Sequence, residues 1–358
     1  MSPALREDAP SVRAAIDRVV TSGSFILGAE VAAFESEFAA ASGAAHAVGV
    51  GSGTDAIALI LRALDIGPGD EVITTPLSAA FTALAVMMVG ARPVFADIDP
   101  TRLTIGPDAV AAAVTARTRA ILPVHLYGQS ADMEALARVA SHHGLPIVED
   151  CCQAHLATAA GRPVGTIGVA GAFSFYPTKN LGALGDGGAV VTNEASLAER
   201  IKRLRNGGQS HRCHHELPGI NSRLDEMQAA ILRARLPHLG GWTAARRRLA
   251  ALYHAELAGA PAVTVPPPLD AGHVYHLFVV LTPRRTRLQQ HLAARGIDTL
   301  VHYPVSIARQ PALAAMAPAD CPRAARICDE LLSLPLHPGL TDRAVRQVAT
   351  AVRELQEG

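Results

Sequence analysis

One lysine stands out among the residues of this chain that could do chemistry. Of its 32 basic residues, all but Lys179 and Lys202 are arginine, and Lys179 lies in an apolar, glycine-rich loop between two strand-like runs. Arginine cannot lose its proton in a protein, whereas a lysine removed from water can attack a carbonyl carbon as a free amine. The loop therefore predicts Schiff-base chemistry at Lys179. A structural lysine beside a tight turn is the alternative interpretation.

A second candidate lies at 49–55, where a strand-like run meets a helix-like run with the sequence Gly-Val-Gly-Ser-Gly-Thr-Asp. Glycines at such a junction expose the N–H groups of a helix N-terminus, which bind phosphate. The spacing does not fit a dinucleotide-binding fingerprint, because Thr54 stands where the third glycine belongs. It does not fit the nucleophile elbow of hydrolases either, because Val50 and Thr54 flank Ser52 where glycines are required. A phosphate-binding turn and an ordinary glycine turn are both left open.

A third candidate is Asp150, which follows the apolar run 145–148. Sheets of α/β proteins bind ligands beyond the carboxyl ends of their strands, so a carboxylate at this edge can hold a proton on a heterocyclic nitrogen. Helix capping or a surface position is the alternative for an isolated aspartate. Together, a phosphate-binding turn, a strand-end carboxylate and a loop lysine are the groups that pyridoxal phosphate requires. Lys179, once released, would then move the substrate α-proton as an acid/base.

The elements expected to position these residues alternate along the chain. Short β-branched runs alternate with Ala/Leu-rich helical windows, which is typical of βαβ units and of a mostly parallel sheet covered on both faces. Gly23 and Gly43 are expected to end the first two helices. We predict strands at 47–50, 71–75, 93–96, 120–124, 146–148, 171–175, 188–192 and 275–281. We predict helices at 11–20, 30–40, 55–64, 82–89, 108–114, 133–142, 197–205, 224–235, 242–257, 288–295, 322–332 and 341–355.

Length and composition favour two domains with a large buried core, since 49% of the 358 residues are hydrophobic. Pro237 and the pair Gly240-Gly241 suggest the boundary. We therefore expect a large α/β domain with the N-terminal helices at 1–240 and a smaller C-terminal α+β domain at 241–358. A polar, His-rich loop at 206–222 is expected to lie outside the core.

Charge and cysteine content exclude several classes of protein. The formal net charge is zero and no long block of like charge occurs, so neither nucleic acid nor an anionic membrane is the expected partner. Apolar runs such as 81–91 are too short to span a bilayer, and residues 1–10 carry charges where a signal peptide would be apolar. The five cysteines form no C-x-x-C pair. We expect a cytoplasmic protein with reduced thiols and no metal ligand.

A series of segments runs in order along nearly the whole chain: Gly51-Ser-Gly-Thr-Asp-Ala56, Pro123-Val-His-Leu-Tyr-Gly-Gln129, Glu149-Asp150 with Gln153-Ala-His155, Phe173-Ser-Phe-Tyr-Pro177 with Lys179-Asn-Leu-Gly, Gly185-Asp-Gly-Gly188, Asn221-Ser-Arg-Leu-Asp-Glu226, Tyr275-His-Leu-Phe278, His302-Tyr-Pro304 and Leu332-Ser-Leu-Pro335. Together these segments resemble the DegT/DnrJ/StrS family of sugar aminotransferases. This family has the fold-type-I architecture of aspartate aminotransferase, so the resemblance implies that α/β fold and pyridoxal 5'-phosphate as the cofactor.

The resemblance implies a role for each matching residue. Lys179 resembles the lysine that binds the cofactor, Asp150 the partner of the pyridine nitrogen, and Gln153 the residue at the ring hydroxyl. The implied phosphate ligands are Gly53, Thr54 and Ser174, with Asn221 supplied by the neighbouring subunit of a homodimer. The residues expected at the substrate are Tyr176, His302 and Tyr303 at the sugar and Arg212 at the pyrophosphate.

Several positions depart from the family pattern. Ala79 and Ala80 stand where an aromatic commonly stacks on the cofactor ring, and Phe81 is the nearest substitute. The pair Cys151-Cys152 replaces two alanines. Two further departures lie near the substrate: Arg-Cys-His-His at 212–215 replaces Lys-Tyr-x-His, and the stretch 305–308 lacks the usual proline and histidine. The identity of the substrate is therefore less constrained than that of the cofactor.

The resemblance implies an aminotransferase that converts a nucleotide-diphosphate-linked keto sugar, a 3-keto-6-deoxyhexose, to the amino sugar, with L-glutamate as donor and 2-oxoglutarate as product. The segments around Tyr127 and Lys179 are most similar to the 3-amino branch of the family. A 4-keto sugar or a ketocyclitol is an alternative substrate. A non-catalytic regulator that binds the cofactor is an alternative of another class, which the presence of both Lys179 and Asp150 disfavours.

Overall fold

The protein, described here by a computed structural model over residues 8–316 and 318–355, is built on a central seven-stranded sheet. The strand order is β1-β9-β8-β5-β4-β2-β3, in which isolated parallel bridges from Ile121 to Ile147 and from Val124 to Asp150 join β4 to β5. Neighbouring strands are parallel except that β9 is antiparallel to β1 and β8. The strands are β1 (His46–Val50), β2 (Glu71–Thr74), β3 (Arg92–Phe95), β4 (Thr118–Leu122), β5 (Val148–Asp150), β8 (Ala170–Ser174) and β9 (Gly188–Thr192).

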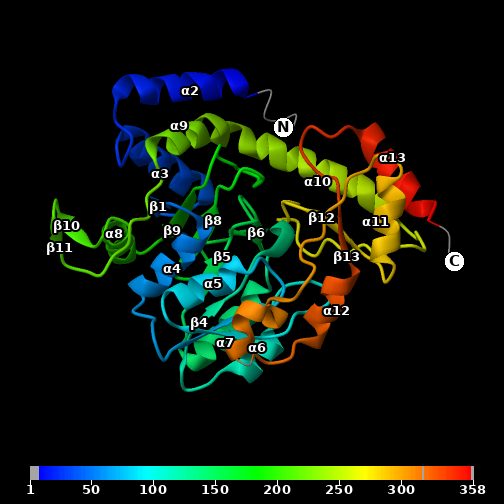
Figure 1. Cartoon of the computed structure of the whole chain (residues 1–358), viewed down its shortest axis with the longest axis horizontal. Coiled ribbons are helices and arrows are strands. Elements are labelled where there is room, and N and C mark those ends of the chain that lie inside the picture. The colour runs from blue at the N-terminus through cyan, green and yellow to red at the C-terminus, as the bar shows by residue number, and fades with distance from the viewer. Residues whose placement is uncertain (1–7, 317, 356–358) are drawn as a thin grey trace.

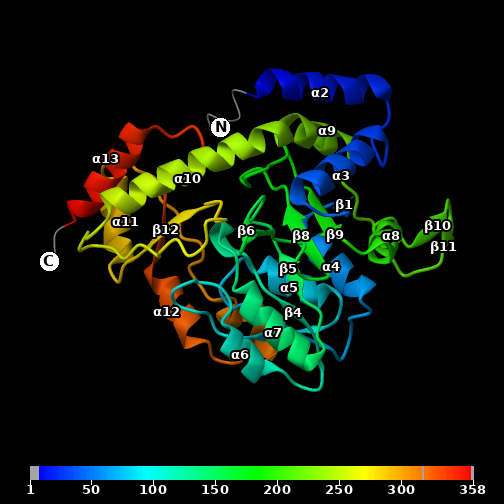
Figure 2. The same ribbon diagram turned by 180° about the vertical axis from the view of Figure 1, so that it is seen from behind.

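Helices cover both faces of this sheet, as Figures 1 and 2 show from opposite sides. Successive strand residues point to opposite faces, so Phe173 packs into one layer and its neighbour Ala172 into the other. The first layer contains α3 (Ala29–Ser42), α6 (Pro107–Ala113), α7 (Met133–His143) and α9 (Glu226–Arg235). The second contains α4 (Gly53–Ala63), α5 (Phe81–Met88) and α8 (Ala195–Leu204).

The C-terminal part has a core of its own. The antiparallel strands β12 (Phe278–Leu281) and β13 (Leu331–Leu334) pack with α11 (Arg285–Ala293) and α13 (Asp342–Arg353). The helix α9 leads through a 3-10 turn into α10 (Leu239–Glu256), which reaches this core (Figure 1). The first described helix, α2 (Ala9–Ser22), packs on α9. The helix α12 (Pro322–Glu330) packs instead beside Phe95, Val124 and Leu126 of the sheet region.

The predicted domain boundary between residues 240 and 241 remains a prediction. Gly240 and Gly241 lie inside α10, which begins at Leu239 and carries the chain from the sheet region toward the C-terminal core. Residues 1–7, on which part of the argument against a signal peptide rests, lie outside the described residues. Across residues 8–316 and 318–355, no helix has both the length and the apolar character needed to cross a membrane.

Most predicted elements are confirmed, with shifts at their ends. Gly23 and Gly43 end α2 and α3 in the left-handed conformation, as expected for glycine. Residues 331–332, predicted as helix, belong to β13, because a short apolar run has no periodicity that separates a buried strand from a helix. The predicted strand 275–281 begins only at Phe278, since the N–H of His276 donates to the carbonyl of Tyr127. The loop 206–222 contains a hairpin, β10 (Gln209–His211) and β11 (His214–His215).

A buried carboxylate holds the end of β5 in place. Glu149 accepts hydrogen bonds from the N–H groups of Gly165 (2.8 Å), Ile167 (2.8 Å) and Gly168 (2.7 Å) and lies 3.0 Å from Nε2 of His125. Burial acts to raise the pKa of Glu149, but these partners outweigh it and hold the pKa below its usual value. The ligand atoms of His125, Glu149 and Cys151 lie within 4.8 Å of one another, yet the carboxylate is already occupied by these protein donors.

We predict that Glu149→Gln lowers the free energy of unfolding by about 3 kcal/mol, because two charge-assisted hydrogen bonds of roughly 1.5 kcal/mol or more are lost. The native pKa of Glu149 lies below its value of 4.5 in an unfolded chain, so its contribution is present above that pH and is lost as the pH falls through the native pKa. Denaturant unfolding at several pH values measures both effects. Glu134→Gln, at an exposed Glu134–Arg138 pair, is the matched control, and equal losses in the two variants would contradict the prediction.

Candidate active site

Lys179 lies in the loop that joins the neighbouring strands β8 and β9. Its N–H donates to the carbonyl of Tyr176 (2.8 Å), and the next residue, Asn180, is buried and donates from Nδ2 to the carbonyl of Val274 (3.3 Å). Burial lowers the pKa of Lys179, although the neighbouring Cys152 and Asp150 act to raise it. A larger fraction of this lysine is therefore the neutral amine that attacks carbonyl carbons.

Asp150 ends β5 with a donor on each carboxylate oxygen. The hydroxyl of Thr82, in the first turn of α5, donates to Oδ2 (2.8 Å), and the N–H of Cys152 donates to Oδ1 (3.1 Å). Thr82 and Asp150 are 2% and 4% exposed, so water does not compete with this hydrogen bond. The two donors fix the plane of the carboxylate and leave lone pairs for a further donor, such as a ring N–H.

The predicted phosphate-binding turn is the N-terminus of α4. Ser52 caps the helix by accepting from the N–H of Asp55 (3.1 Å), while the first-turn N–H groups at Gly53 and Thr54 have no partner within the helix by its geometry. A Cβ atom at Gly53 would lie 2.6 Å from Sγ of Cys152 and 2.8 Å from Cβ of Ser174. Only glycine therefore lets α4 begin beside the end of β8, where Ser174 lies.

Gln153 connects the site to the C-terminal part of the chain. Its Oε1 accepts from the N–H of Tyr127 (2.7 Å), and its Nε2 donates to the hydroxyl of Tyr303 (2.9 Å). The hydroxyl of Tyr127 donates to the carbonyl of His302 (2.5 Å), and Nδ1 of His302 lies 2.9 Å from Oγ of Ser333. Burial raises the pKa of Tyr303, and Asp150 and Cys152 act in the same direction. Burial lowers the pKa of His302, and Lys179 acts in the same direction. Residues 150 sequence positions apart thus meet at one site.

Three of the predicted residues lie apart from this group. Tyr176 is 52% exposed in the Lys179 loop. Arg212 is exposed at the tip of the β10–β11 hairpin, which projects from the body of the protein in Figure 1. Asn221 is exposed and forms an isolated bridge with Asn206. Their predicted roles require a substrate or a second subunit to complete the site.

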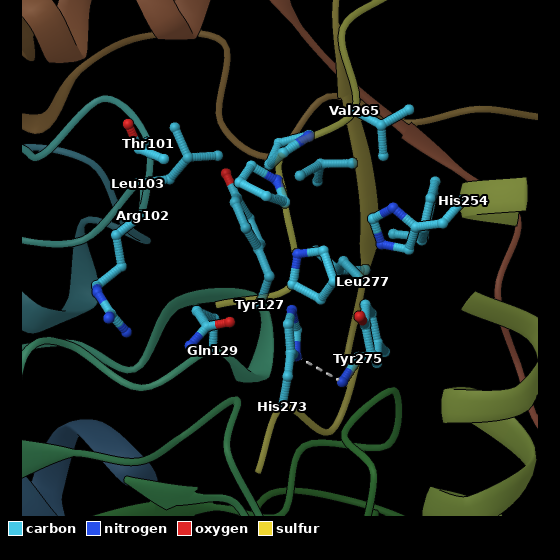
Figure 3. A pocket seen from close by; sticks show the side chains of 15 residues that line it. Thr101, Arg102, Leu103, Tyr127, Gln129, His254, Val265, His273, Tyr275 and Leu277 are labelled. Atoms are coloured by element: carbon cyan, nitrogen blue, oxygen red, sulfur yellow. Dashed lines mark hydrogen bonds between the residues drawn. The ribbon is translucent and has the colours of Figure 1, made fainter. Parts of the chain in front are cut away.

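A small recess lies behind Tyr127, and Figure 3 shows it from close by. Its volume of about 40 Å³ has room for about three water molecules. One wall belongs to the segment 265–279, where Asp270 accepts hydrogen bonds from Arg102 (2.5 Å) and Ser130 (2.9 Å) and also from Gln129. The hydrogen bonds of Asp270 therefore join the segment 265–279 to the turn that carries Tyr127 and hold that turn in place.

The turn around Tyr127 is a functional feature that the sequence did not reveal. Tyr127 has a left-handed backbone (φ 58°), which costs a non-glycine residue about 1 kcal/mol or more. In this conformation its N–H reaches Gln153 while its carbonyl accepts from the N–H of His276 (2.8 Å). Thr82 was missed as well, because a single threonine in an apolar helix has no distinctive pattern.

Comparison with known proteins identifies the family of this chain. The DegT/DnrJ/EryC1/StrS aminotransferase family matches residues 7–353. The dTDP-3-amino-3,4,6-trideoxy-alpha-D-glucose transaminase of Streptomyces venezuelae is 52% identical over 347 residues, which cover 96% of this chain and 92% of that protein. The UDP-N-acetyl-3-dehydro-alpha-D-glucosamine 3-aminotransferase of Acidithiobacillus ferrooxidans is 45% identical over 343 residues, which cover 96% and 93%. The crystal structure of S. venezuelae DesV in complex with a ketimine intermediate has a TM-score of 0.96 and 51% identity, covering 98% of this chain and 95% of that one.

The fold and these comparisons define a pyridoxal-phosphate-dependent aminotransferase of fold type I. The chain belongs to the DegT/DnrJ/EryC1/StrS aminotransferase family. The residues present fit the cofactor, because N–H donors at α4, the carboxylate of Asp150 and the amine of Lys179 match its phosphate, ring nitrogen and carbonyl. When bound, pyridoxal phosphate supplies a ring that accepts the electrons left behind as a proton departs from the substrate carbon.

We predict that Thr82→Val raises the dissociation constant for pyridoxal phosphate about tenfold, because Asp150 loses a charge-assisted hydrogen bond worth roughly 1.5 kcal/mol. Valine keeps the shape of threonine but has no hydroxyl. Thr82→Ser keeps the donor and is the matched control, which should bind within about twofold of the wild type. Titration of the unloaded protein with the cofactor, followed by visible absorbance, measures both constants. Equal binding by the valine variant would show that Thr82 does not support Asp150.

Proposed function

We propose that this aminotransferase acts on a nucleotide-diphosphate-linked 3-keto-6-deoxyhexose and forms the 3-amino sugar, with L-glutamate as the amino donor. The observation that carries the proposal is the similarity, over nearly the whole chain, to relatives whose names specify amination at carbon 3. The relatives differ in nucleotide and in sugar, which leaves the ring position as their common feature. Sugar hydroxyls are recognised best by fixed hydrogen-bond donors and acceptors, and the site offers several.

In the proposed reaction the chain's own residues bind, orient and move a proton. Lys179 would form the link to the cofactor. Once released, its amine would move the proton between the substrate carbon that loses or gains the amino group and the carbonyl carbon of the cofactor. Asp150, fixed by Thr82 and the N–H of Cys152, holds the proton on the ring nitrogen. Gly53, Thr54 and Ser174 would hold the phosphate, and Gln153 would contact the ring hydroxyl. Tyr176, His302 and Tyr303 contact the sugar.

A homodimer with shared active sites is the second part of the proposal. Ser222 is fixed within its own chain, since its hydroxyl donates to Asp55 (2.8 Å) and accepts from the N–H of Gly51 (2.9 Å), while the adjacent Asn221 is exposed. Exposed apolar side chains include Phe25 (52%) and Leu184 (51%), which a partner subunit would cover. Asn221 would then complete the phosphate site of the partner, and Arg212 would meet the pyrophosphate of its substrate.

The shared site predicts complementation between two inactive chains. Co-expressed Lys179→Ala and Asn221→Ala chains should recover about a quarter of wild-type activity at limiting cofactor, because half of the dimers are mixed and each mixed dimer has one intact site. A pairing of Lys179→Ala with Gln153→Ala is the matched control, since both residues belong to one chain's site and no intact site can form. Recovery in the control, or a monomer in sedimentation, would refute the arrangement.

The proposed substrate predicts the preference of the reverse reaction. Supplied with 2-oxoglutarate, the enzyme should consume a nucleotide-linked 3-amino-6-deoxyhexose faster than its 4-amino isomer, by on the order of 100-fold in kcat/KM. Glutamate formation measures the rate, and Lys179→Arg provides the inactive control. Equal or opposite preference would move the assignment to a 4-keto sugar or a ketocyclitol. Activity on neither isomer, with cofactor bound, would favour a regulatory protein.

A further inference from the structure

We propose that the Tyr303 hydroxyl is a cofactor ligand, which donates a hydrogen bond to the ring hydroxyl oxygen of pyridoxal phosphate beside Gln153. The proposal rests on the assigned positions of Asp150 and Lys179 at opposite ends of the cofactor ring. It adds a function to a residue otherwise expected only at the sugar. Four observations support it: the orientation of one amide, the use of the neighbouring polar groups, the layout of the site and the burial of Tyr303.

The orientation of the Gln153 amide leaves the Tyr303 proton free. Oε1 of Gln153 accepts from the N–H of Tyr127 at 2.7 Å, so Nε2 must be the atom that lies 2.9 Å from the Tyr303 hydroxyl. An amide N–H is a donor, so the hydroxyl oxygen is the acceptor in this contact. Within residues 8–316 and 318–355, the Tyr303 hydroxyl proton has no acceptor. This proton is therefore available to a ligand.

Neighbouring polar side chains are already engaged elsewhere. Asn180 donates to the carbonyl of Val274, and its Oδ1 faces Nδ1 of His276 at 3.2 Å. Nδ1 of His302 lies 2.9 Å from the hydroxyl of Ser333. Unlike Asn180 and His302, Tyr303 can therefore offer a donor beside Gln153 without breaking an existing hydrogen bond.

The structure of the cofactor places its ring hydroxyl on the Tyr303 side. In pyridoxal phosphate the formyl carbon is opposite the ring nitrogen, and the phosphate arm and the hydroxyl flank it on opposite sides. With the nitrogen at Asp150 and the formyl carbon at Lys179, the phosphate arm points to α4, which begins beside Cys152 and Ser174. The hydroxyl then points to the other edge, where Gln153 contacts the Tyr127 turn and Tyr303.

Tyr303 remains a donor throughout the working pH range. Its side chain is partly buried, and this burial raises the pKa of Tyr303 to about 12, with Asp150 and Cys152 acting in the same direction against Gln153. A donor to the ring oxygen stabilises negative charge there. Loss of that donor makes the nitrogen that joins Lys179 to the cofactor hold its proton to a higher pH.

The test is a pH titration of the visible absorbance of the loaded enzyme, with no sugar present. We expect Tyr303→Phe to move the midpoint upward by about one pH unit, a tenfold change in the protonation equilibrium. Tyr253→Phe is the matched control, because it also removes a buried hydroxyl hydrogen bond, to the carbonyl of Pro335 (2.9 Å), but in the C-terminal core. Its midpoint should equal that of the wild type.

Two outcomes would overturn the proposal. One is an unchanged midpoint in Tyr303→Phe. A higher KM for the sugar in that variant would then make Tyr303 a substrate contact only. The other is a wild-type protein without a visible band, which would also overturn the cofactor positions at Asp150 and Lys179. Circular dichroism of each variant checks that it is folded, and a Gln153→Leu variant, which frees Tyr303 from its fixed partner, should also shift the midpoint.

Discussion

The architecture depends on two adjacent carboxylates at the end of a three-residue strand. Successive residues of a strand point to opposite faces, so Glu149 and Asp150 enter different surroundings although they are neighbours in sequence. Glu149 is fully enclosed and accepts three backbone N–H groups, which fixes the end of β5 against the loop 165–168. Asp150, on the other face, accepts from the Thr82 hydroxyl and the N–H of Cys152 and keeps acceptor capacity for a ligand. Glu149 thus fixes the strand end that positions Asp150.

The site is closed by contacts between distant parts of the chain. Glycine at position 53 lets the start of α4 approach the end of β8, and the Tyr127 turn joins Gln153 to the segment that carries Tyr303. Asn180, beside Lys179, is held by the carbonyl of Val274. Movement of the C-terminal part would therefore alter the surroundings of the reactive amine.

The sequence predicted the sheet and its covering helices because strand-like and helix-like hydrophobic patterns alternate along the chain. It indicated Lys179, Asp150 and the α4 turn because their residue types and positions suit one cofactor. It could not predict that Thr82 supports Asp150, since a hydroxyl facing a carboxylate 68 positions away leaves no local pattern. The left-handed backbone of Tyr127 was hidden for a similar reason, because glycine and not tyrosine is the usual residue there. Residues 331–332 were wrongly predicted as helix because two leucines directly after a helix have no periodicity that separates a buried strand from a continuing helix.

The central claim is that Lys179 is the amine that joins the cofactor. Lys202, the chain's other lysine, is an internal control, because it lies on α8 in an exposed pair with Glu199 (2.6 Å). Borohydride reduction of the loaded enzyme, followed by peptide mapping, is the most direct measurement. The account predicts a stable cofactor label on Lys179 and none in Lys179→Arg, which keeps the charge but not the amine chemistry. A label on Lys202, or transamination by Lys179→Arg at the wild-type rate, would contradict it.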